Sequence, residues 1–100
     1  MSNNRFNDKV AVVVGGTTGI GLEIVKGLLS EGASVVVGAR RKELLDDLEK
    51  KYGNKVVGVQ SDATVEEDQI KLVNTAVEKF GRLDVAFNVA GASKSLPNFS

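Results

Sequence analysis

A glycine-rich turn directly after an apolar run is the feature that most limits how this chain can fold. Residues 10–14 are all apolar, and they lead into the segment Gly15-Gly16-Thr17-Thr18-Gly19-Ile20-Gly21. Apolar residues then recur at helical spacing, at Ile20, Ile24, Val25, Leu28 and Leu29. A strand, a glycine turn and a helix in this order are typical of a phosphate-binding turn, because the first amides of a helix are unpaired and its dipole favours an anion.

The glycine spacing narrows the class of turn. We expect Gly15 to adopt φ values closed to other residues, while Gly19 and Gly21, which lack a Cβ, let a pyrophosphate approach and the helix pack closely. The pattern is G-x-x-x-G-x-G rather than the usual dinucleotide fingerprint G-x-G-x-x-G. No Lys-Ser or Lys-Thr pair follows the last glycine, which excludes a P-loop. Taken alone, the glycines also fit a tight turn that binds no ligand.

The rest of the chain alternates between short apolar runs and amphipathic segments. We predict strands at residues 9–14, 33–38, 56–60 and 83–88, and helices at 19–30, at 41–52 and from Thr64 to Gly81. This alternation predicts an α/β fold, a Rossmann-type doubly wound parallel sheet with helices on both faces. Right-handed crossovers give the strand order 3-2-1-4 and a crevice where the order reverses. The 100 residues are interpreted as part of one domain.

Two details of the third helix follow from the same patterns. Thr64 and Glu67 have the T-x-x-E spacing of a capping box. The apolar face that this helix turns toward the sheet is predicted from residues at helical spacing, namely Ile70, Val73, Val77 and Phe80.

Composition excludes several classes of function. Lys+Arg and Asp+Glu are both 13, so no basic field points to nucleic acid. Cysteine and histidine are absent, which removes disulfides, zinc sites of the usual type and a histidine-based triad. No apolar leader or membrane-spanning run stands out, and the lack of cysteine fits a reducing compartment, so a cytoplasmic location without membrane contact is expected.

Arg40 and Arg41 follow the second predicted strand and indicate which dinucleotide would bind. An NAD site has an acidic residue about 20 residues after the glycine motif, which holds the ribose 2′-hydroxyl. Here Ala39 stands there, followed by the two arginines. A guanidinium pairs with a 2′-phosphate, so the pattern favours NADP(H) over NAD(H), mainly through Arg40. The alternative is that both arginines are solvated charges at a helix start.

Two further segments follow the third and fourth strands. After the third strand, Asp62 could accept a hydrogen bond from a purine amine, with Ala63 beside it; a turn-forming role is the alternative. After the fourth strand come Asn88, Ala90 and Gly91, of which the last two are small enough for a ring or ribose to lie against the backbone. A strand-ending turn would also explain them.

These residues together resemble the N-terminal part of a short-chain dehydrogenase/reductase. The family motif T-G-x-x-x-G-x-G corresponds to residues 14–21, the motif N-N-A-G to residues 88–91, and Asp62 matches the family's adenine-contacting aspartate. Val14 replaces the usual threonine and Val89 replaces the second asparagine. The resemblance implies hydride transfer between a nicotinamide and a small carbonyl or alcohol substrate, and a homo-oligomer when full length.

No catalytic residue of that family can be assigned in this chain. The family uses a tyrosine, a lysine four residues later, a serine and an asparagine, all located after N-N-A-G. The single tyrosine is Tyr52, which Val56 follows four residues later. We therefore expect the catalytic residues beyond Ser100 and no activity from residues 1–100 alone. An NADP(H)-binding module without catalysis stays open, as does an S-adenosylmethionine methyltransferase, which Ala39 and Arg40 disfavour.

Overall fold

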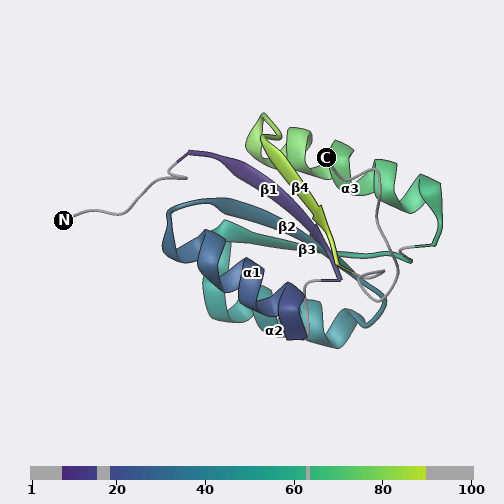
Figure 1. Ribbon diagram of the computed structural model, residues 1–100, viewed down its shortest axis with the longest axis horizontal. Coiled ribbons are helices and arrows are strands. Elements are labelled where there is room, and N and C mark those ends of the chain that lie inside the picture. Colours follow the sequence, from purple (N-terminus) through teal and green to yellow (C-terminus); the bar gives the residue numbers. More distant parts are fainter. Residues whose placement is uncertain (1–7, 16–18, 63, 90–100) are drawn as a thin grey trace.

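A computed structural model of the protein describes residues 8–15, 19–62 and 64–89. In this part of the chain, strands and helices alternate (Figure 1). The strands are β1 (Val10–Val14), β2 (Ser34–Ala39), β3 (Val56–Gln60) and β4 (Val85–Asn88). The helices are α1 (Gly19–Ser30), α2 (Lys42–Tyr52), the short 3₁₀ helix η1 (Gly53–Lys55) and α3 (Glu66–Phe80). All predicted elements are present, with boundaries within two residues of those expected.

The four strands form one parallel sheet in the order β3-β2-β1-β4, as predicted. Val12 on the central strand β1 is in register with Val36 of β2 on one side and with Ala86 of β4 on the other. From β1 the chain builds the sheet outward on one side, through β2 and β3, and then crosses to the other side of β1 to form β4. The strand order therefore reverses between β1 and β4. Parallel order places all four carboxyl ends at one edge, where the crevice of such sheets lies.

The valine-rich strands are buried on both faces because helices cover both (Figure 1). On one face, α1 and α2 contribute Val25, Leu28, Leu45 and Leu48 to a core with alternate strand residues. On the other face, Leu72 and Ala76 of α3 pack on the intervening strand residues. This two-sided burial explains why β1 and residues 35–37 of β2 are continuously apolar rather than alternating.

Gly58 lets α2 lie close to the edge strand β3. A Cβ added at Gly58 would come within 2.7 Å of the Leu45 Cβ, which is nearer than van der Waals contact permits. The Gly58 N–H also donates to the Glu49 carboxylate at 2.6 Å, so the same helix covers an outward backbone group of the sheet edge.

We predict that Gly58→Ala lowers the free energy of unfolding by about 1–3 kcal/mol, because the helix must move to accommodate the methyl group. Gly27→Ala is the matched control: it lies within α1, nothing stands within 4 Å of its added Cβ, and alanine is the better helix former by about 0.5–1 kcal/mol. Denaturant unfolding of both variants checks this. If Gly58→Ala were as stable as Gly27→Ala, the close packing of α2 on β3 would be wrong.

The predicted capping box at the start of α3 is wrong. The helix begins at Glu66 with Val65 as its N-cap, and no side chain caps it. Thr64 instead directs its backbone N–H and its hydroxyl to the Asp62 carboxylate, at 2.9 and 2.6 Å. Because the helix begins two residues after Thr64, Val65 rather than Thr64 is the N-cap, and the Thr64 hydroxyl is free to donate to a charged acceptor in its own loop.

The predicted apolar face of α3 is also largely wrong. Ile70, Val73 and Val77 are 53%, 38% and 50% exposed, whereas Leu72 and Ala76 are fully buried. Both sets have helical spacing, so periodicity alone cannot decide which one faces the sheet. The small Ala76 permits a close approach that a row of β-branched residues would hinder, and Phe80 extends the buried row as a partly buried neighbour. In α1, Ile20 is likewise 66% exposed rather than packed.

Asp84 ties the amino ends of β1 and β4 together. One carboxylate oxygen accepts the Val10 N–H at 2.8 Å, and the other accepts two bonds from the Arg82 guanidinium. The Asp84 N–H donates to the Val10 carbonyl oxygen, also at 2.8 Å. Arg82 foremost, and then the Val10 N–H, lower the pKa of the Asp84 carboxyl.

This lowered pKa predicts acid sensitivity. A carboxyl whose folded-state pKa lies below its unfolded value stabilises the fold above the unfolded value, and the contribution is lost as the pH falls through the folded value. We expect the thermal midpoint to fall in that acidic range, and Asp84→Asn to reduce the fall while lowering the midpoint at neutral pH. Melts of both proteins across the acidic range test it; identical pH profiles would contradict the role of Asp84.

Candidate functional site

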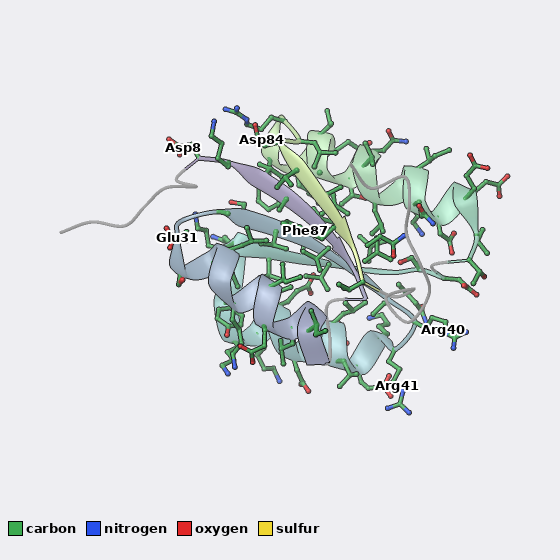
Figure 2. The ribbon with its side chains drawn as sticks, viewed as in Figure 1. Asp8, Glu31, Arg40, Arg41, Asp84 and Phe87 are labelled. Carbon is green, nitrogen blue, oxygen red and sulfur yellow. The ribbon has the colours of Figure 1, made fainter. Side chains whose placement is uncertain are left out.

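The candidate site lies at the carboxyl ends of the strands, where the first segment after each strand carries predicted site residues. Gly15 follows β1, Arg40 and Arg41 follow β2, and Asp62 follows β3. Arg40 and Arg41 lie at this end of the sheet, whereas Asp8, Glu31 and Asp84 lie at the other (Figure 2). Because β1 lies between β2 and β4, the glycine turn stands beside the reversal of strand order.

Two described glycines of the motif, Gly15 and Gly19, have the positive φ that favours glycine. Gly15 has φ 85°, and its N–H donates to the Gly38 carbonyl oxygen at 2.7 Å, which ends β1 against β2. Gly19, the first residue of α1, has φ 58°, and nothing stands within 4 Å of an added Cβ. Gly21 is buried. The predicted residues Thr17 and Thr18 lie outside the described residues.

Within the described residues, nothing therefore crowds the backbone at Gly19, where α1 begins. The first turn of α1 contains no acidic residue that would compete for its backbone amides. The first amides of any helix lack intrahelical partners, and its dipole adds positive potential there. The exposed Ile20 side chain lies on this same turn. The arrangement fits the diphosphate of a dinucleotide, which needs donors and positive potential but no cationic side chain.

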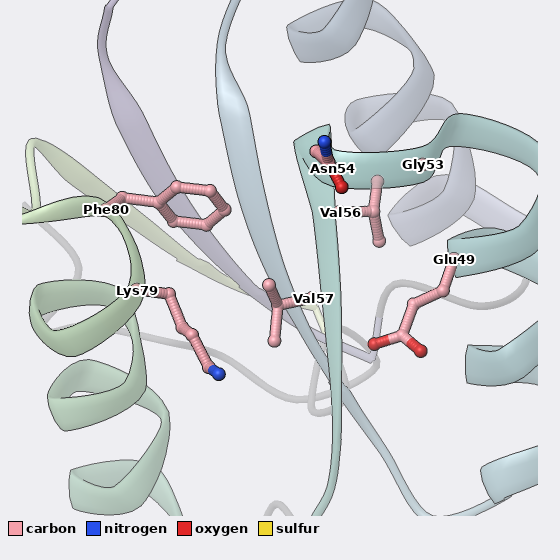
Figure 3. A pocket seen from close by; sticks show the side chains of 7 residues that line it. All are labelled: Glu49, Gly53, Asn54, Val56, Val57, Lys79 and Phe80. Atoms are coloured by element: carbon pink, nitrogen blue, oxygen red, sulfur yellow. The ribbon is translucent and has the colours of Figure 1, made fainter.

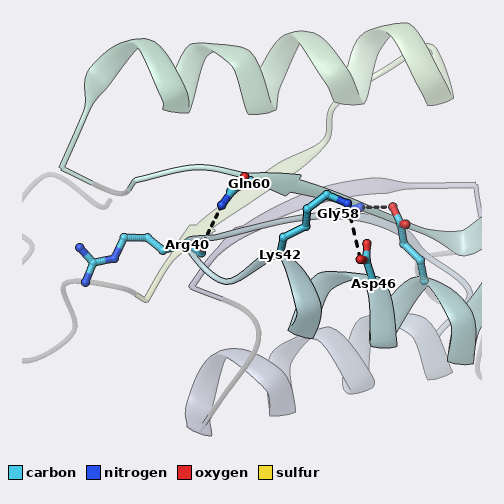
Figure 4. Close-up of polar contacts among 6 residues, drawn as sticks. Arg40, Lys42, Asp46, Gly58 and Gln60 are labelled. Atoms are coloured by element: carbon cyan, nitrogen blue, oxygen red, sulfur yellow. Dashed lines mark hydrogen bonds and ion pairs between the residues drawn. The ribbon is translucent and has the colours of Figure 1, made fainter.

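Arg40 is exposed and its side chain points away from Gln60 and α2 (Figure 4). Its carbonyl oxygen accepts the Gln60 side-chain amide at 3.1 Å, so its backbone is held at the edge of the sheet. The neighbouring Lys42 is paired with Asp46. Within residues 8–15, 19–62 and 64–89, the Arg40 guanidinium forms no hydrogen bond or ion pair. Arg41 is the N-cap of α2, without a side-chain capping bond.

Asp62 is held in place by bonds within its own loop. One oxygen of its carboxylate, Oδ1, accepts both bonds from Thr64. The Thr64 hydroxyl foremost, and then the Thr64 N–H, lower the pKa of the Asp62 carboxyl, and the charge of Arg40 acts in the same direction. Asp62 is therefore an anion at neutral pH. Asp62 thus has the turn-forming role that was expected as an alternative. Among the described residues, only Oδ1 of its two carboxylate oxygens takes part in the turn.

Two buried oxygens near this end of the sheet have no hydrogen-bond donor among the described residues. They are Oδ1 of Asn88, at the end of β4, and Oγ of Ser61, beside Gly38 and Leu72. A buried polar atom without a partner is uncommon unless water or a ligand completes it. Asn88 thus fits a place at a polar ligand site. Ala63, Ala90 and Gly91, the other residues predicted here, lie outside the described residues.

Val14 and Val89, the two departures from the family motifs, are joined through the backbone. The Val89 N–H donates to the Val14 carbonyl oxygen at 3.0 Å, which links the carboxyl ends of β1 and β4 without any side chain. The loss of a threonine hydroxyl and an asparagine amide therefore leaves the strand ends connected.

An open hollow lies elsewhere, around the amino end of β3 (Figure 3). Val57 and Phe80 line it on the α3 side, and Glu49 and Val56 on the α2 side. It is at the opposite end of β3 from Asp62. In the described part of the chain, no group of three metal-ligating side chains occurs and no helix could cross a membrane.

Comparison with known proteins identifies the family. The sequence profile described as short chain dehydrogenase matches residues 9–100, nearly the whole chain. The chain belongs to the short-chain dehydrogenase/reductase family. Members of this family are oxidoreductases that use nicotinamide dinucleotides, and the residues at the carboxyl ends of the strands fit such a cofactor.

Individual relatives agree with this assignment. The chain is 42% identical over 91 residues to dehydrogenase/reductase SDR family member 4 of Caenorhabditis elegans, covering 87% of this chain and 35% of that protein. It is 39% identical over 89 residues to tropinone reductase-like 1 of Erythroxylum coca, covering 89% of this chain and 33% of that protein. The chain thus spans about a third of the length of these relatives.

A solved structure has the same fold. A short-chain dehydrogenase/reductase from Brucella melitensis, described as a glucose/ribitol dehydrogenase, superposes with a TM-score of 0.78 at 28% sequence identity. The match covers 86% of this chain and 37% of the Brucella chain.

Sequence reasoning missed three residues that hold the predicted ones in place. Gln60 bonds to the Arg40 carbonyl oxygen, Thr64 to the Asp62 carboxylate, and Asp68 to the Asp62 N–H. The Asp-x-Thr spacing of residues 62 and 64 is a recognisable local motif and could have indicated the second contact. The other two bonds join residues in different elements, and no short-range pattern reveals them.

Proposed function

We propose that this chain is the cofactor-binding part of an NADP(H)-dependent short-chain oxidoreductase. The observation that carries the cofactor preference is the Arg40 guanidinium at the end of β2, which has no hydrogen bond or ion pair within the described residues. Ala39 stands there in place of the acidic residue of an NAD site. An acidic residue there would repel a 2′-phosphate, whereas the guanidinium pairs with it. In this proposal residues 1–100 form the N-terminal part of a longer nucleotide-binding domain, and NAD(H) binds less well.

In this proposal each of the candidate site residues contacts a different part of the cofactor. The amides at the start of α1 hold the diphosphate, and Gly15 and Gly19 keep the turn open for it. Arg40, supported by Arg41, binds the 2′-phosphate. Asp62 accepts the exocyclic amine of adenine through Oδ2. Asn88 faces the ribose and nicotinamide side, where the bound cofactor supplies the hydride.

The proposed reaction interconverts a small carbonyl compound and an alcohol. The proton-transfer residues of the family are expected beyond Ser100, because Tyr52 is partly buried against the α1–α2 core at the end of α2 and cannot serve. Residues 1–100 alone are therefore expected to bind dinucleotide without turnover. We also propose a homo-oligomeric, cytoplasmic enzyme, the location resting on the absence of cysteine.

A labelled cofactor tests the proposed activity. The intact protein is incubated with NADPH deuterated at nicotinamide C4 and with a panel of small aldehydes and ketones, and the products are examined by mass spectrometry. Deuterium on the carbinol carbon of a product supports the oxidoreductase. Tight NADPH binding with no transfer to any carbonyl would favour a module that binds the cofactor without catalysis.

A second test concerns Asp62. We predict that Asp62→Ala weakens NADPH binding and lowers the melting temperature only slightly, because the bonds that it removes are the local, exposed ones from Thr64, while the fold is held by the sheet. A thermal melt and a binding titration on the same variant separate the two roles. A large loss of stability with unchanged affinity would show that Asp62 only shapes the turn.

A further inference from the structure

Several backbone groups around Asp62, in the described part of the loop between β3 and α3, form hydrogen bonds. The Ser61 N–H donates to the Ala39 carbonyl oxygen at 2.8 Å, and the Val65 N–H donates to the Asp62 carbonyl oxygen at 3.0 Å. The Asp62 N–H itself donates to Oδ2 of Asp68 at 2.8 Å. The position of the Asp62 backbone is thus fixed from two sides, from its own loop and from the first turn of α3.

Asp68 reaches back out of its helix to make this bond. It is the third residue of α3, partly buried, and it accepts the N–H of a residue six positions earlier. Acidic side chains are favourable at a helix start, and a charged acceptor makes the stronger hydrogen bond. Glu66 and Glu67 share this first turn and its favourable field, but both are exposed. Asp68 alone of the three contacts the Asp62 N–H in the described part of the chain.

These bonds leave one group of Asp62 for a ligand. Its N–H is taken by Asp68, its carbonyl oxygen by Val65 and its Oδ1 by Thr64. Its Oδ2 accepts no hydrogen bond within the described residues. A carboxylate oxygen held in this way loses little freedom when an amine donates to it, and preorganisation of this kind strengthens binding.

Building on the proposed function, we infer that Asp68 is a positioning residue for the adenine end of the dinucleotide. It does not touch the ligand. It holds Asp62 so that Oδ2 points to the exocyclic amine of the base, and without it the Asp62 loop has to be ordered during binding.

Base discrimination tests this inference, because a merely structural role would not affect it. The intact protein and the variant Asp68→Ala are titrated with NADPH and with its hypoxanthine analogue, which has a carbonyl in place of the adenine amine. We expect Asp68→Ala to weaken NADPH binding about three- to tenfold and to change binding of the analogue by no more than about twofold. Asp62→Ala should show the same selectivity, and the double variant should lose nothing further.

Two control variants isolate the hydrogen bond. Glu67→Ala removes a charge from the same helix turn and should leave both affinities unchanged. Asp68→Asn keeps an acceptor oxygen and should retain most of the discrimination. If Asp68→Ala does not fold, Asp68→Ser is used in its place. The serine side chain is shorter than that of aspartate, so its hydroxyl does not reach the Asp62 N–H.

The outcomes separate this inference from the proposed function. If Asp68→Ala binds NADPH as tightly as the wild type does, or loses affinity for NADPH and its hypoxanthine analogue equally, the positioning role is wrong while the proposed function stands. If the wild-type protein binds neither dinucleotide, the proposed function itself is wrong, and the role of Asp68 with it.

Discussion

Replacing Arg40 with alanine is expected to lower the affinity of the intact protein for NADPH by about ten- to a hundredfold and to leave its affinity for NADH nearly unchanged. A charge-assisted contact to the 2′-phosphate contributes about 1.5–3 kcal/mol, which corresponds to this range. NADH has no phosphate at this position, so the guanidinium gains nothing from it. Since Arg40 forms no other side-chain bond in the described part of the chain, the fold should be unaffected. Fluorescence titrations with both dinucleotides measure the effect.

Three companion variants sharpen this prediction. Arg40→Lys keeps the charge but not the two-pronged donor geometry, and should fall between the wild type and Arg40→Ala. Arg41→Ala removes a neighbouring charge and should cost less. Ala39→Asp places a carboxylate where NAD sites have one, and should reverse the preference. Equal loss of NADPH and NADH affinity in Arg40→Ala would contradict contact with the 2′-phosphate.

Gly19→Ala is expected to weaken binding of both dinucleotides on the order of a hundredfold, because its methyl group would displace the diphosphate from the start of α1. Among the described residues, nothing lies within 4 Å of a Cβ added at Gly19, so this part of the protein has room for the methyl group. Its φ of 58° imposes a strain of about 1–2 kcal/mol on alanine. The variant should thus fold with a modestly lower melting temperature and bind poorly.

Gly81→Ala is the matched control for that strain. Gly81 ends α3 with φ 84° and also has nothing within 4 Å of an added Cβ, but it lies at the opposite end of the sheet from the glycine turn. It should lose a similar amount of stability and retain the affinity of the wild type. If Gly19→Ala bound dinucleotides as well as Gly81→Ala does, the start of α1 would not hold the diphosphate.

The order of elements and the topology could be predicted from sequence because they depend on patterns that extend over many residues. Continuous valine runs indicate strands covered on both faces, and β1 and β2 are such strands. Alternation with amphipathic segments then leaves few parallel arrangements. The positive φ at Gly15 could also be expected, because a tight turn directly after a strand favours a residue without a Cβ.

The details at α3 could not be predicted, because two local signals competed there. Two rows of apolar side chains run along this helix, and the choice of Leu72 and Ala76 over Val73 and Val77 depends on how closely the helix approaches Gly38 and the sheet. Thr64 could accept a helix N–H as the N-cap or donate its hydroxyl to Asp62; the helix begins only at Glu66, with Val65 as the N-cap, and the hydroxyl donates to Asp62. Side-chain bonds between separate elements, such as that from Gln60 to Arg40, depend on the finished fold.

Calorimetric titration of the intact protein with NADPH and, separately, with NADH measures whether the protein binds a dinucleotide and which one it prefers. We predict saturable binding of one dinucleotide per chain, with NADPH tighter than NADH by about tenfold or more. Equal affinities for the two would contradict the role of Arg40 and the assignment of NADP(H). Absence of binding to either would contradict the cofactor site itself.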